Sequence, residues 1–208
     1  SRAKRFMSAS RGFARTKPII VIKSGRFTES AKAASSHTGA LAGDNAIYDA
    51  AFRRAGVVRV KEVEDMFNCS SVLETNLLPE GPRLAIVTNA GGPGVMAVDS
   101  MIENKLSLAA LSDETKRTLD SFLPSYWSKG NPVDILGDAD LDRYMKAVEI
   151  CLADDNVDGL LVIYTPQGAA PPTDLAEALV AKVKGRKKPV LTVWIGGSDL
   201  GGARDVFY

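Results

Sequence analysis

Short apolar runs alternate along the chain with segments in which apolar residues recur every three to four positions. The runs are short and end at Gly, Ser or Pro, which is typical of buried β-strands; they lie at residues 17–25, 57–60, 83–89, 106–109, 157–166 and 187–197. The periodic segments predict amphipathic helices at residues 44–55, 61–75, 95–104, 112–122, 141–152 and 174–183. Continuously apolar strands that alternate with helices predict an α/β fold with mainly parallel sheets covered on both faces.

Local signals predict where several helices begin and end. Asp44 and Ser112 precede helical segments as N-caps, and Gly56 follows the segment that Asp44 begins. Asp174 and Glu177 have the spacing of a capping box. In the helix expected at 61–75, the periodicity predicts an inward face made of Val63, Met66, Phe67, Ser70 and Leu73.

The segment NLLPEGP at residues 76–82 predicts a boundary between two units. It places two prolines and a glycine between periodic segments. A chain of 208 residues suits two compact units of about 100 residues each. We therefore expect one unit at 1–78 and a second at 79–208.

Composition narrows the class of protein. The chain is 45% hydrophobic and 25% charged with a net charge of +1, which gives no reason to expect a nucleic-acid surface. No apolar run approaches the roughly 18 residues of a membrane span. Cys69 and Cys151 lie far apart, so we expect reduced thiols and a cytoplasmic location. The basic segment at 1–17 fits a surface helix, with a targeting segment as the alternative.

A glycine-rich turn follows the strand at 83–89 and precedes a helix. Gly91, Gly92, Pro93 and Gly94 form this turn, and a strand, a glycine-rich turn and a helix together can bind phosphate at the free N–H groups of the helix. The pattern matches neither GxGxxG nor a Walker loop, and a plain tight turn explains it equally well.

His37 is the single histidine of the chain and lies among small residues in SSHTGALAGD. Its neighbours Ser36, Thr38 and Gly39 are small enough to approach a phosphoryl group and to donate hydrogen bonds to it. The chain has no second histidine and no cysteine pair at ligand spacing, so no metal site is expected. It also has no GxSxG elbow, which disfavours a Ser-His-Asp hydrolase. A histidine that attacks phosphorus is the remaining chemistry, against a surface or structural histidine.

Four segments together resemble the nucleoside-diphosphate-forming acyl-CoA synthetases, a family that includes ADP-forming acetyl-CoA synthetases and relatives of succinyl-CoA synthetase. KPIIVIKSGR with SSHTGALAGD resembles the phosphohistidine segment of that family. IVTNAGGPGVMAVD, NPVDILGDAD and DGLLVIYTP resemble its ligase domain, in the same order. The resemblance implies two tandem flavodoxin-like units. The first, at 1–78, is part of a succinyl-CoA synthetase-like domain and is expected to be incomplete at its start. The second, at 79–208, is a CoA-ligase domain and is expected to be shortened at its end.

The resemblance also implies a reaction and its residues. An acid, CoA and ATP are interconverted with acyl-CoA, ADP and phosphate, and His37 carries the phosphoryl group between an acyl phosphate and ADP. Gly91, Gly92, Pro93 and Gly94 match a helix start that holds this group, and Asn89 and Asp134 are candidates for substrate contact.

The family resemblance further implies partners. CoA, ATP or ADP and Mg²⁺ are substrates that bind mainly to a CoA-binding domain and to an ATP-grasp domain or subunit of the same enzyme. The enzyme is expected to be an oligomer. No tightly bound cofactor, nucleic acid or membrane is expected to bind it. The glutamate that orients the histidine in the family would fall just before Ser1, so this chain is expected to be part of a larger protein.

Two alternatives stay open. Some protein lysine acetyltransferases carry a synthetase-like region that lost catalysis and acts as a regulatory binding module, and QGAAPPTDLAEAL suits such a region. A generic α/β module with a surface histidine is the other. For individual residues, Asp134 and Asp138 are also turn formers, and Lys23 and Arg26 are also ordinary surface charges. Trp127 and Trp194 are expected to pack in the core.

Overall fold

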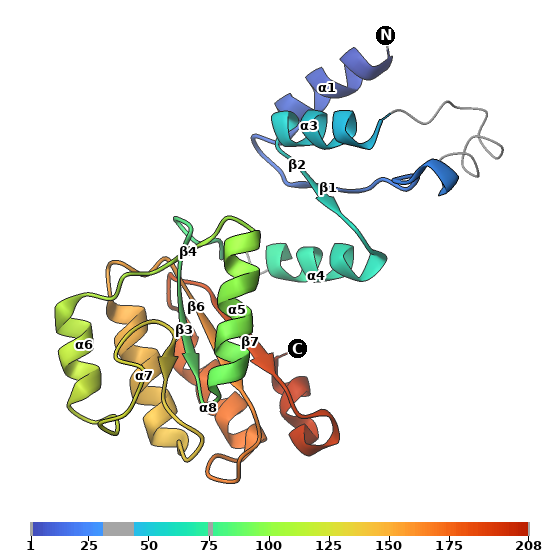
Figure 1. Cartoon of the computed structure of the whole chain (residues 1–208). Helices are drawn as coiled ribbons and strands as arrows, with labels where there is room; N and C mark the ends of the chain where they lie inside the picture. Colours follow the sequence, from blue (N-terminus) through green and yellow to red (C-terminus); the bar gives the residue numbers. More distant parts are fainter. Residues whose placement is uncertain (1, 31–43, 75–76, 208) are drawn as a thin grey trace. The chain divides into compact units, whose positions relative to one another are not determined.

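The computed structural model describes residues 2–30, 44–74 and 77–207 (Figure 1). The chain divides into two compact units, Ser1–Asn76 and Leu77–Tyr208. Within the described ranges, no helix has both the length and the apolar character needed to cross a membrane. The α/β class with parallel strands, expected from the sequence, is confirmed in both units.

The first unit contains a parallel pair of strands, β1 (Ile19–Ile22) and β2 (Val57–Val60), joined by α3 (Asn45–Ala55). Asp44 begins α3 as predicted, because its Oδ1 accepts the N–H of Ala46 at 2.8 Å. Gly56 ends α3 in the left-handed conformation, at φ 71°. α1 (Arg2–Phe13) packs against α3, and a small core forms from Phe52, Ala55, Val57, Met7, Ile19, Val21 and Tyr48.

The inward face predicted for the next helix is wrong within this unit. α4 (Val63–Glu74) contains no buried residue, and Val63 and Phe67 are 62% and 68% exposed. The two-stranded β1–β2 sheet is too narrow to cover that face, although α4 contacts both strands. Apolar periodicity identifies the helix, but it cannot show how much sheet is available to cover it.

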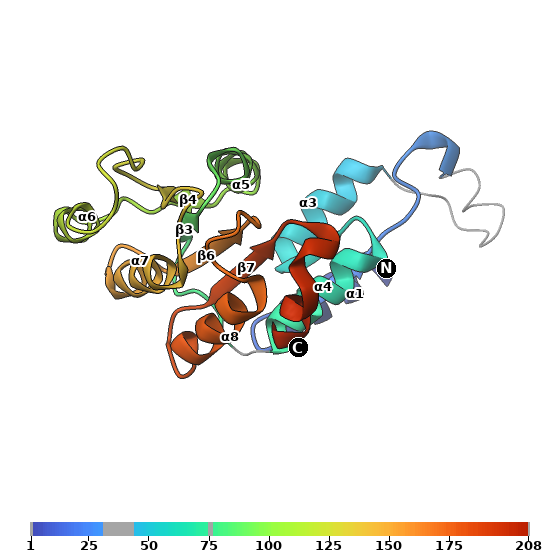
Figure 2. The same ribbon diagram turned by 90° about the horizontal axis from the view of Figure 1, so that it is seen from below.

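The second unit is a five-stranded parallel sheet in the order β4-β3-β6-β7, with β5 paired to β3. Its strands are β3 (Arg83–Thr88), β4 (Ser107–Leu108), β5 (Val133–Asp134), β6 (Gly159–Tyr164) and β7 (Val190–Trp194). Its helices are α5 (Gly91–Glu103), α6 (Asp113–Asp120), α7 (Leu141–Ala153) and α8 (Pro172–Val183), followed by a 3₁₀ segment, Gly197–Phe207. α5 lies on one side of the sheet, and α7 and α8 lie on the other (Figure 2).

Alternate residues of the central strands face the two sides. Ala85 and Val87 of β3 join the large core beneath α6, α7 and α8. Ile86 of β3 and Ile163 of β6 face α5 and pack with Met101. Burial on both faces explains why β3 and β6 read as continuous apolar runs.

The side chain of Asn131 fills a gap in the sheet. Along one edge of β3, β4 pairs at Arg83–Leu84 and β5 pairs at Val87–Thr88. Between them, Asn131 Oδ1 accepts the N–H of Ile86 at 2.9 Å, and Asn131 Nδ2 donates to the carbonyl oxygens of Leu84 and Ala109 at 3.0 Å each. One amide therefore replaces strand hydrogen bonds where the ladder is interrupted.

The starts of α5 and α8 differ from the predicted ones. Ser112 caps α6 as expected, since its Oγ accepts the N–H of Thr115 at 3.1 Å. α5, in contrast, begins at Gly91 rather than at residue 95, so the glycines form its first turn. α8 begins at Pro172, and its N-cap Pro171 makes no side-chain hydrogen bond, so the capping box of Asp174 and Glu177 is wrong.

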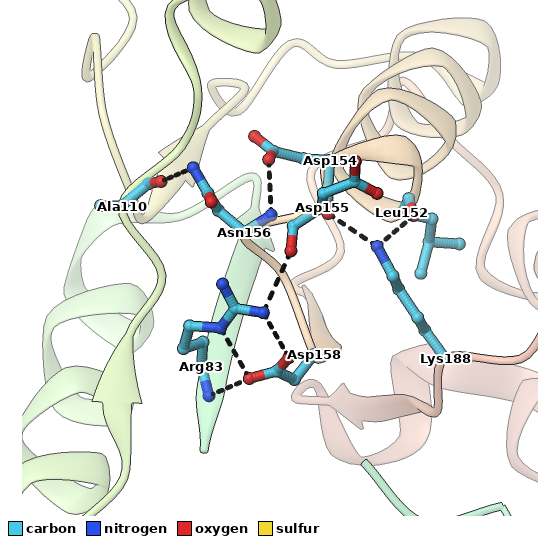
Figure 3. Close-up of polar contacts among 8 residues, drawn as sticks. All are labelled: Arg83, Ala110, Leu152, Asp154, Asp155, Asn156, Asp158 and Lys188. Carbon is cyan, nitrogen blue, oxygen red and sulfur yellow. Dashed lines mark hydrogen bonds and ion pairs between the residues drawn. The ribbon is translucent and has the colours of Figure 1, made fainter. Parts of the chain in front are cut away.

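A polar network closes the amino edge of the same sheet (Figure 3). Lys188 Nζ donates to the carbonyl oxygens of Leu152 at 2.9 Å and of Asp154 at 2.6 Å, at the end of α7. The amide of Asn156 donates to the carbonyl oxygen of Ala110 at 2.9 Å. These contacts fasten loops at the edge opposite to the strand ends where ligands bind in such sheets.

Candidate functional site

Three strand ends converge at the carboxyl edge of the second unit. β3 ends at Thr88 and continues through Asn89 into α5, β5 ends at Asp134, and β6 ends at Tyr164 and continues into Thr165. In parallel sheets of this kind, ligands bind outside the carboxyl ends of the strands. The structure therefore places the predicted residues Asn89, Gly91 and Asp134 at one edge.

The start of α5 keeps its first-turn N–H groups without a side-chain cap. Its N-cap residue is Ala90, which has extended backbone angles and makes no side-chain hydrogen bond. The hydroxyl of Thr88 instead bonds the backbone of Ala90, at 3.0 Å to its N–H and 2.9 Å to its oxygen. A helix start of this kind presents donors and the positive end of a dipole to an anion.

The three glycines of this turn have different surroundings. A Cβ on Gly94 would lie 3.1 Å from Thr88 Cγ2 and 3.6 Å from Pro132 Cβ, so Gly94 permits close packing of α5 on β3. A Cβ on Gly91 would lie 3.1 Å from Asp134 Oδ2. A Cβ on Gly92 would meet nothing within 4 Å. Only Gly92 therefore faces open space, where a ligand can approach the backbone.

Asp134 lies beside the start of α5 in a strained turn. Its Oδ1 accepts the N–H of Leu136 at 3.0 Å, and Leu136 has φ 70°, a conformation that L-residues rarely adopt. Backbone strain of this kind gathers at functional sites, where the surrounding structure holds it. Asp138, the neighbouring candidate, pairs with Arg143 Nη1 at 2.6 Å, and this hydrogen bond holds the pKa of Asp138 below its usual value.

Asn89 joins two of the converging loops. It is 3% exposed; its Nδ2 donates to the carbonyl oxygen of Thr165 at 2.7 Å, and its Oδ1 accepts the N–H of Thr165 at 2.9 Å. These bonds use both ends of the amide, so within the described residues Asn89 positions the ends of β3 and β6. Its contact with a substrate stays a prediction.

Gln167 is a residue of this edge that the sequence did not indicate. Its Nε2 donates to Thr165 Oγ1 at 3.0 Å, and a Cβ on Gly137 would lie 1.9 Å from Gln167 Oε1. The exposed Gln167 side chain therefore crosses from the end of β6 to the loop after β5. Its position shortly after an apolar strand was the one signal that could have identified it.

In the first unit, the carboxyl ends of β1 and β2 carry basic residues. Lys23 Nζ lies 4.8 Å from the ring centroid of Tyr48, and Arg26 Nη2 donates to the carbonyl oxygen of Val60 at 2.9 Å. Both side chains are half-buried and have partners, so they are more than solvated surface charges. His37, Ser36, Thr38 and Gly39 lie outside the described residues, and their roles stay predictions.

The tryptophans and Tyr144 of the described ranges have structural roles. No group of three or more His, Cys, Asp or Glu residues suited to a metal ion occurs in these ranges. Trp127 is 2% exposed and donates to Asp120 Oδ1 at 2.7 Å, and the ring of Trp194 packs against Tyr164, as predicted. Burial raises the pKa of the Tyr144 hydroxyl, which donates to the carbonyl oxygen of Ile163 beneath the sheet.

Comparison with known protein families matches both units. Residues 1–73 match the succinyl-CoA ligase like flavodoxin domain, and residues 84–208 match the ligase-CoA domain. Together the two matches span most of the chain in the order that the sequence motifs indicated.

Individual relatives cover nearly the whole chain. It is 38% identical over 205 residues to the alpha subunit of acetate–CoA ligase [ADP-forming] I of Pyrococcus furiosus, covering 98% of this chain and 44% of the relative. It is 43% identical over 179 residues to acetate–CoA ligase [ADP-forming] I of Archaeoglobus fulgidus, covering 86% of this chain and 26% of the relative.

A solved structure has the same fold. The dinucleotide-forming acetyl-coenzyme A synthetase 1 of Ca. Korarchaeum cryptofilum, in complex with phosphate and ADP, superposes with a TM-score of 0.90 at 36% identity. The alignment covers 98% of this chain and 44% of that protein, so the chain spans less than half the length of these relatives. With both domain families matched in order, the chain belongs to the nucleoside-diphosphate-forming acyl-CoA synthetase family, in which a succinyl-CoA ligase-like flavodoxin domain precedes a ligase-CoA domain.

Proposed function

We propose that the protein containing this chain interconverts an acid, CoA and ATP with acyl-CoA, ADP and phosphate. The observation that carries the proposal is the 38% identity to an ADP-forming acetate–CoA ligase alpha subunit over 98% of the chain. Residues 1–78 would form part of the flavodoxin domain with the phosphohistidine loop, and residues 79–208 the CoA-ligase domain. The chain spans less than half of its relatives, so other regions complete the reaction.

His37 would carry the phosphoryl group. In the direction of ATP synthesis, an imidazole nitrogen of His37 attacks the phosphorus of an acyl phosphate, the P–O bond breaks, and the carboxylate leaves. An oxygen of the terminal phosphate of ADP then attacks the same phosphorus, the P–N bond breaks, and ATP forms. A largely neutral imidazole near pH 7 is suited to this attack. Ser36, Thr38 and Gly39 would donate hydrogen bonds to the phosphoryl oxygens.

The start of α5 would stabilise the phosphoryl group during transfer. Fixed N–H donors at a helix start stabilise an anion without the reorganisation that water requires. Gly92 supports this role, because a ligand can approach its backbone without meeting a side chain. Gly91, Pro93 and Gly94 would shape the same turn.

Asp134 would position a substrate group that bears a proton. Its carboxylate lies beside Gly91, where it would repel a dianion that has no O–H to donate in a hydrogen bond. A hydroxyl or thiol hydrogen satisfies this carboxylate, so we assign Asp134 to a neutral part of the substrate. Asn89 would act through Thr165 by holding the two loops in place.

The partners follow from the same assignment. CoA, ATP or ADP and Mg²⁺ would bind mainly to CoA-binding and ATP-grasp regions of the same enzyme, which we expect to be oligomeric. Cys69 and Cys151 are free thiols, which is in keeping with the expected cytoplasmic location. The relatives reported above are named as ligases, which favours the enzyme over the regulatory module.

An acyl-CoA assay tests the proposal. The full-length protein, with any separate ATP-grasp subunit, is incubated with CoA, Mg-ATP and a panel of acids, and acyl-CoA and ADP are measured. We expect equal amounts of the two products, and a loss of about a thousandfold or more in His37→Ala, because the nucleophile is removed. Lys116→Ala, a surface change in α6, serves as the matched control. A His37→Ala enzyme as fast as the wild type would refute the mechanism, and CoA binding without turnover would favour the regulatory module.

A further inference from the structure

A small cavity lined by charged and polar residues lies in the first unit, at the carboxyl end of the β1–β2 pair. It has a volume of about 190 Å³ and is lined by Arg26, Asn45, Asp49, Arg59 and Lys61. These residues come from the segment after β1, the first turns of α3, and the end of β2. The cavity therefore occupies the edge at which parallel sheets bind ligands.

Arg59 is the buried cation of this cavity. Its side chain is 10% exposed; Nη1 lies 2.6 Å from Asp49 Oδ1, and Nη2 donates to the carbonyl oxygen of Lys23 at 2.9 Å. Its third nitrogen, Nε, is buried and has no acceptor among the described residues. A buried N–H without an acceptor is destabilising, so a bound acceptor at this position would be favoured.

Asn45 contributes a buried acceptor without a hydrogen-bond donor among the described residues, in addition to the buried donor of Arg59. Its Nδ2 donates to Asp49 Oδ2 at 3.4 Å, while its Oδ1 is buried and receives no hydrogen bond from the described part of the chain. The cavity thus requires one acceptor, for Arg59 Nε, and one donor, for Asn45 Oδ1. A monoprotonated phosphate group has both, since it carries acceptor oxygens and an O–H.

Charge and size distinguish a phosphate group from other occupants. Three of the five lining side chains are cationic and one is anionic, so the cavity has a net positive charge. A neutral water molecule would not balance this charge, whereas an anion would. The volume equals that of about six water molecules and is below the roughly 300 Å³ at which pockets for whole small molecules begin. A single oxyanionic group therefore fits, and arginine forks recognise phosphate oxygens well.

We propose that the pocket formed by Arg26, Asn45, Asp49, Arg59 and Lys61 binds one phosphate group. The group is supplied by free inorganic phosphate or by a phosphate of CoA. The choice of these two sources rests on the proposed function, whereas the preference of the pocket for a phosphate-type anion does not.

Direct binding of inorganic phosphate tests the pocket. The full-length protein carries His37→Ala, so that no phosphoryl transfer contributes, and phosphate is titrated by calorimetry at constant ionic strength. We expect saturable binding that Lys61→Gln and Arg26→Gln each weaken by about fivefold or more, because each removes one cation beside the anion. Lys116→Gln, which removes a lysine that pairs with Asp113 on α6 in the other unit, is the matched control and should not change the affinity.

A second titration identifies the source of the group. If the pocket holds the 3′-phosphate of CoA, Lys61→Gln weakens binding of CoA but not of 3′-dephospho-CoA. If it holds free phosphate, both CoA forms are unaffected and only phosphate binding weakens. The proposal is overturned if folded Lys61→Gln and Arg26→Gln variants bind both phosphate and CoA as tightly as the protein that carries only His37→Ala. It is also overturned if that protein binds neither phosphate nor CoA. Because His37 is already replaced, these outcomes are independent of whether the protein forms acyl-CoA.

Discussion

Arg83 and Asp158 join β3 to the start of β6 through one carboxylate (Figure 3). Asp158 Oδ2 accepts the backbone N–H and the Nε–H of Arg83, both at 2.9 Å, and Oδ1 accepts from Arg83 Nη2 at 2.7 Å. Gly81 must be glycine here, because a Cβ would lie 2.5 Å from Asp158 Oδ2. This pair stabilises the amino edge of the sheet. The candidate functional site lies at the opposite, carboxyl edge.

This pair predicts a dependence of stability on acid pH. Hydrogen bonds from the Arg83 side chain, followed by its backbone N–H, lower the pKa of Asp158 from 3.8 to about 2. The folded pKa lies below the unfolded one, so the stabilisation is complete above about pH 4 and is lost as the pH falls through 2. Asp158→Asn should therefore lower the melting temperature at pH 7 and lower it progressively less towards pH 2. A difference from wild type that stays constant from pH 7 to pH 2 would contradict this account.

Asn131 should be more important for stability than for chemistry. Asn131→Ala removes three hydrogen bonds and leaves the backbone groups of Leu84, Ile86 and Ala109 without these partners, so we expect a loss of about 2 kcal/mol or more in unfolding free energy. Asn104→Ala is the control: its exposed amide donates to the carbonyl oxygen of Ser100 at the end of α5, and we expect a change within about 0.5 kcal/mol. Urea titrations measure both, and equal losses would refute the gap-filling role.

Two glycines of the same turn should respond in opposite ways. Gly94→Ala crowds Thr88, whose Cγ2 would lie 3.1 Å from the added Cβ, and should lower stability by about 1–3 kcal/mol. Gly92→Ala meets no neighbour and should leave stability unchanged or raise it by up to about 1 kcal/mol, since alanine favours a helix. Its methyl group nevertheless lies where we place the phosphoryl group, so turnover should fall by about tenfold. A fully active Gly92→Ala enzyme would argue against this helix start as the phosphoryl site.

The buried thiol of Cys151 should be unreactive. Burial raises its pKa to about 12, so at pH 8 only about one part in ten thousand is the reactive thiolate. Cys69 is half-buried instead. Mass spectrometry after iodoacetamide treatment should find label on Cys69 in the folded protein and on Cys151 only after addition of denaturant. Rapid labelling of Cys151 without denaturant would show that the large core of the second unit unfolds locally under native conditions.

Patterns along the chain predicted most of the fold because they report local physics. The apolar runs located β1, β3, β6 and β7, and the caps Asp44 and Ser112 act within a few residues of their own backbone. The glycine-rich turn after β3 was identified for the same reason, although the helix begins four residues earlier than expected. Glycine disfavours helix on its own, so the position of that start is set by packing on β3, which the local pattern does not contain.

The features that escaped prediction depend on contacts between distant residues. Asn131 was part of a quoted motif, but its role required knowing that β4 and β5 share one edge of β3. Gln167 and the orphan atoms of Arg59 and Asn45 became visible only when separate segments met in space. For His37, the sequence supplies the residue and its small neighbours, and the phosphohistidine chemistry stays a proposal.

The most direct measurement is the phosphorylation of His37. The full-length protein, with any separate ATP-binding subunit, is incubated with Mg-ATP and kept at alkaline pH. The modified peptide is then mapped beside that of His37→Ala. We expect an acid-labile phosphoryl group on the peptide that contains His37, which ADP, or CoA with an acid, removes. A folded, complete protein that acquires no phosphoryl group at His37 would contradict the phosphohistidine mechanism.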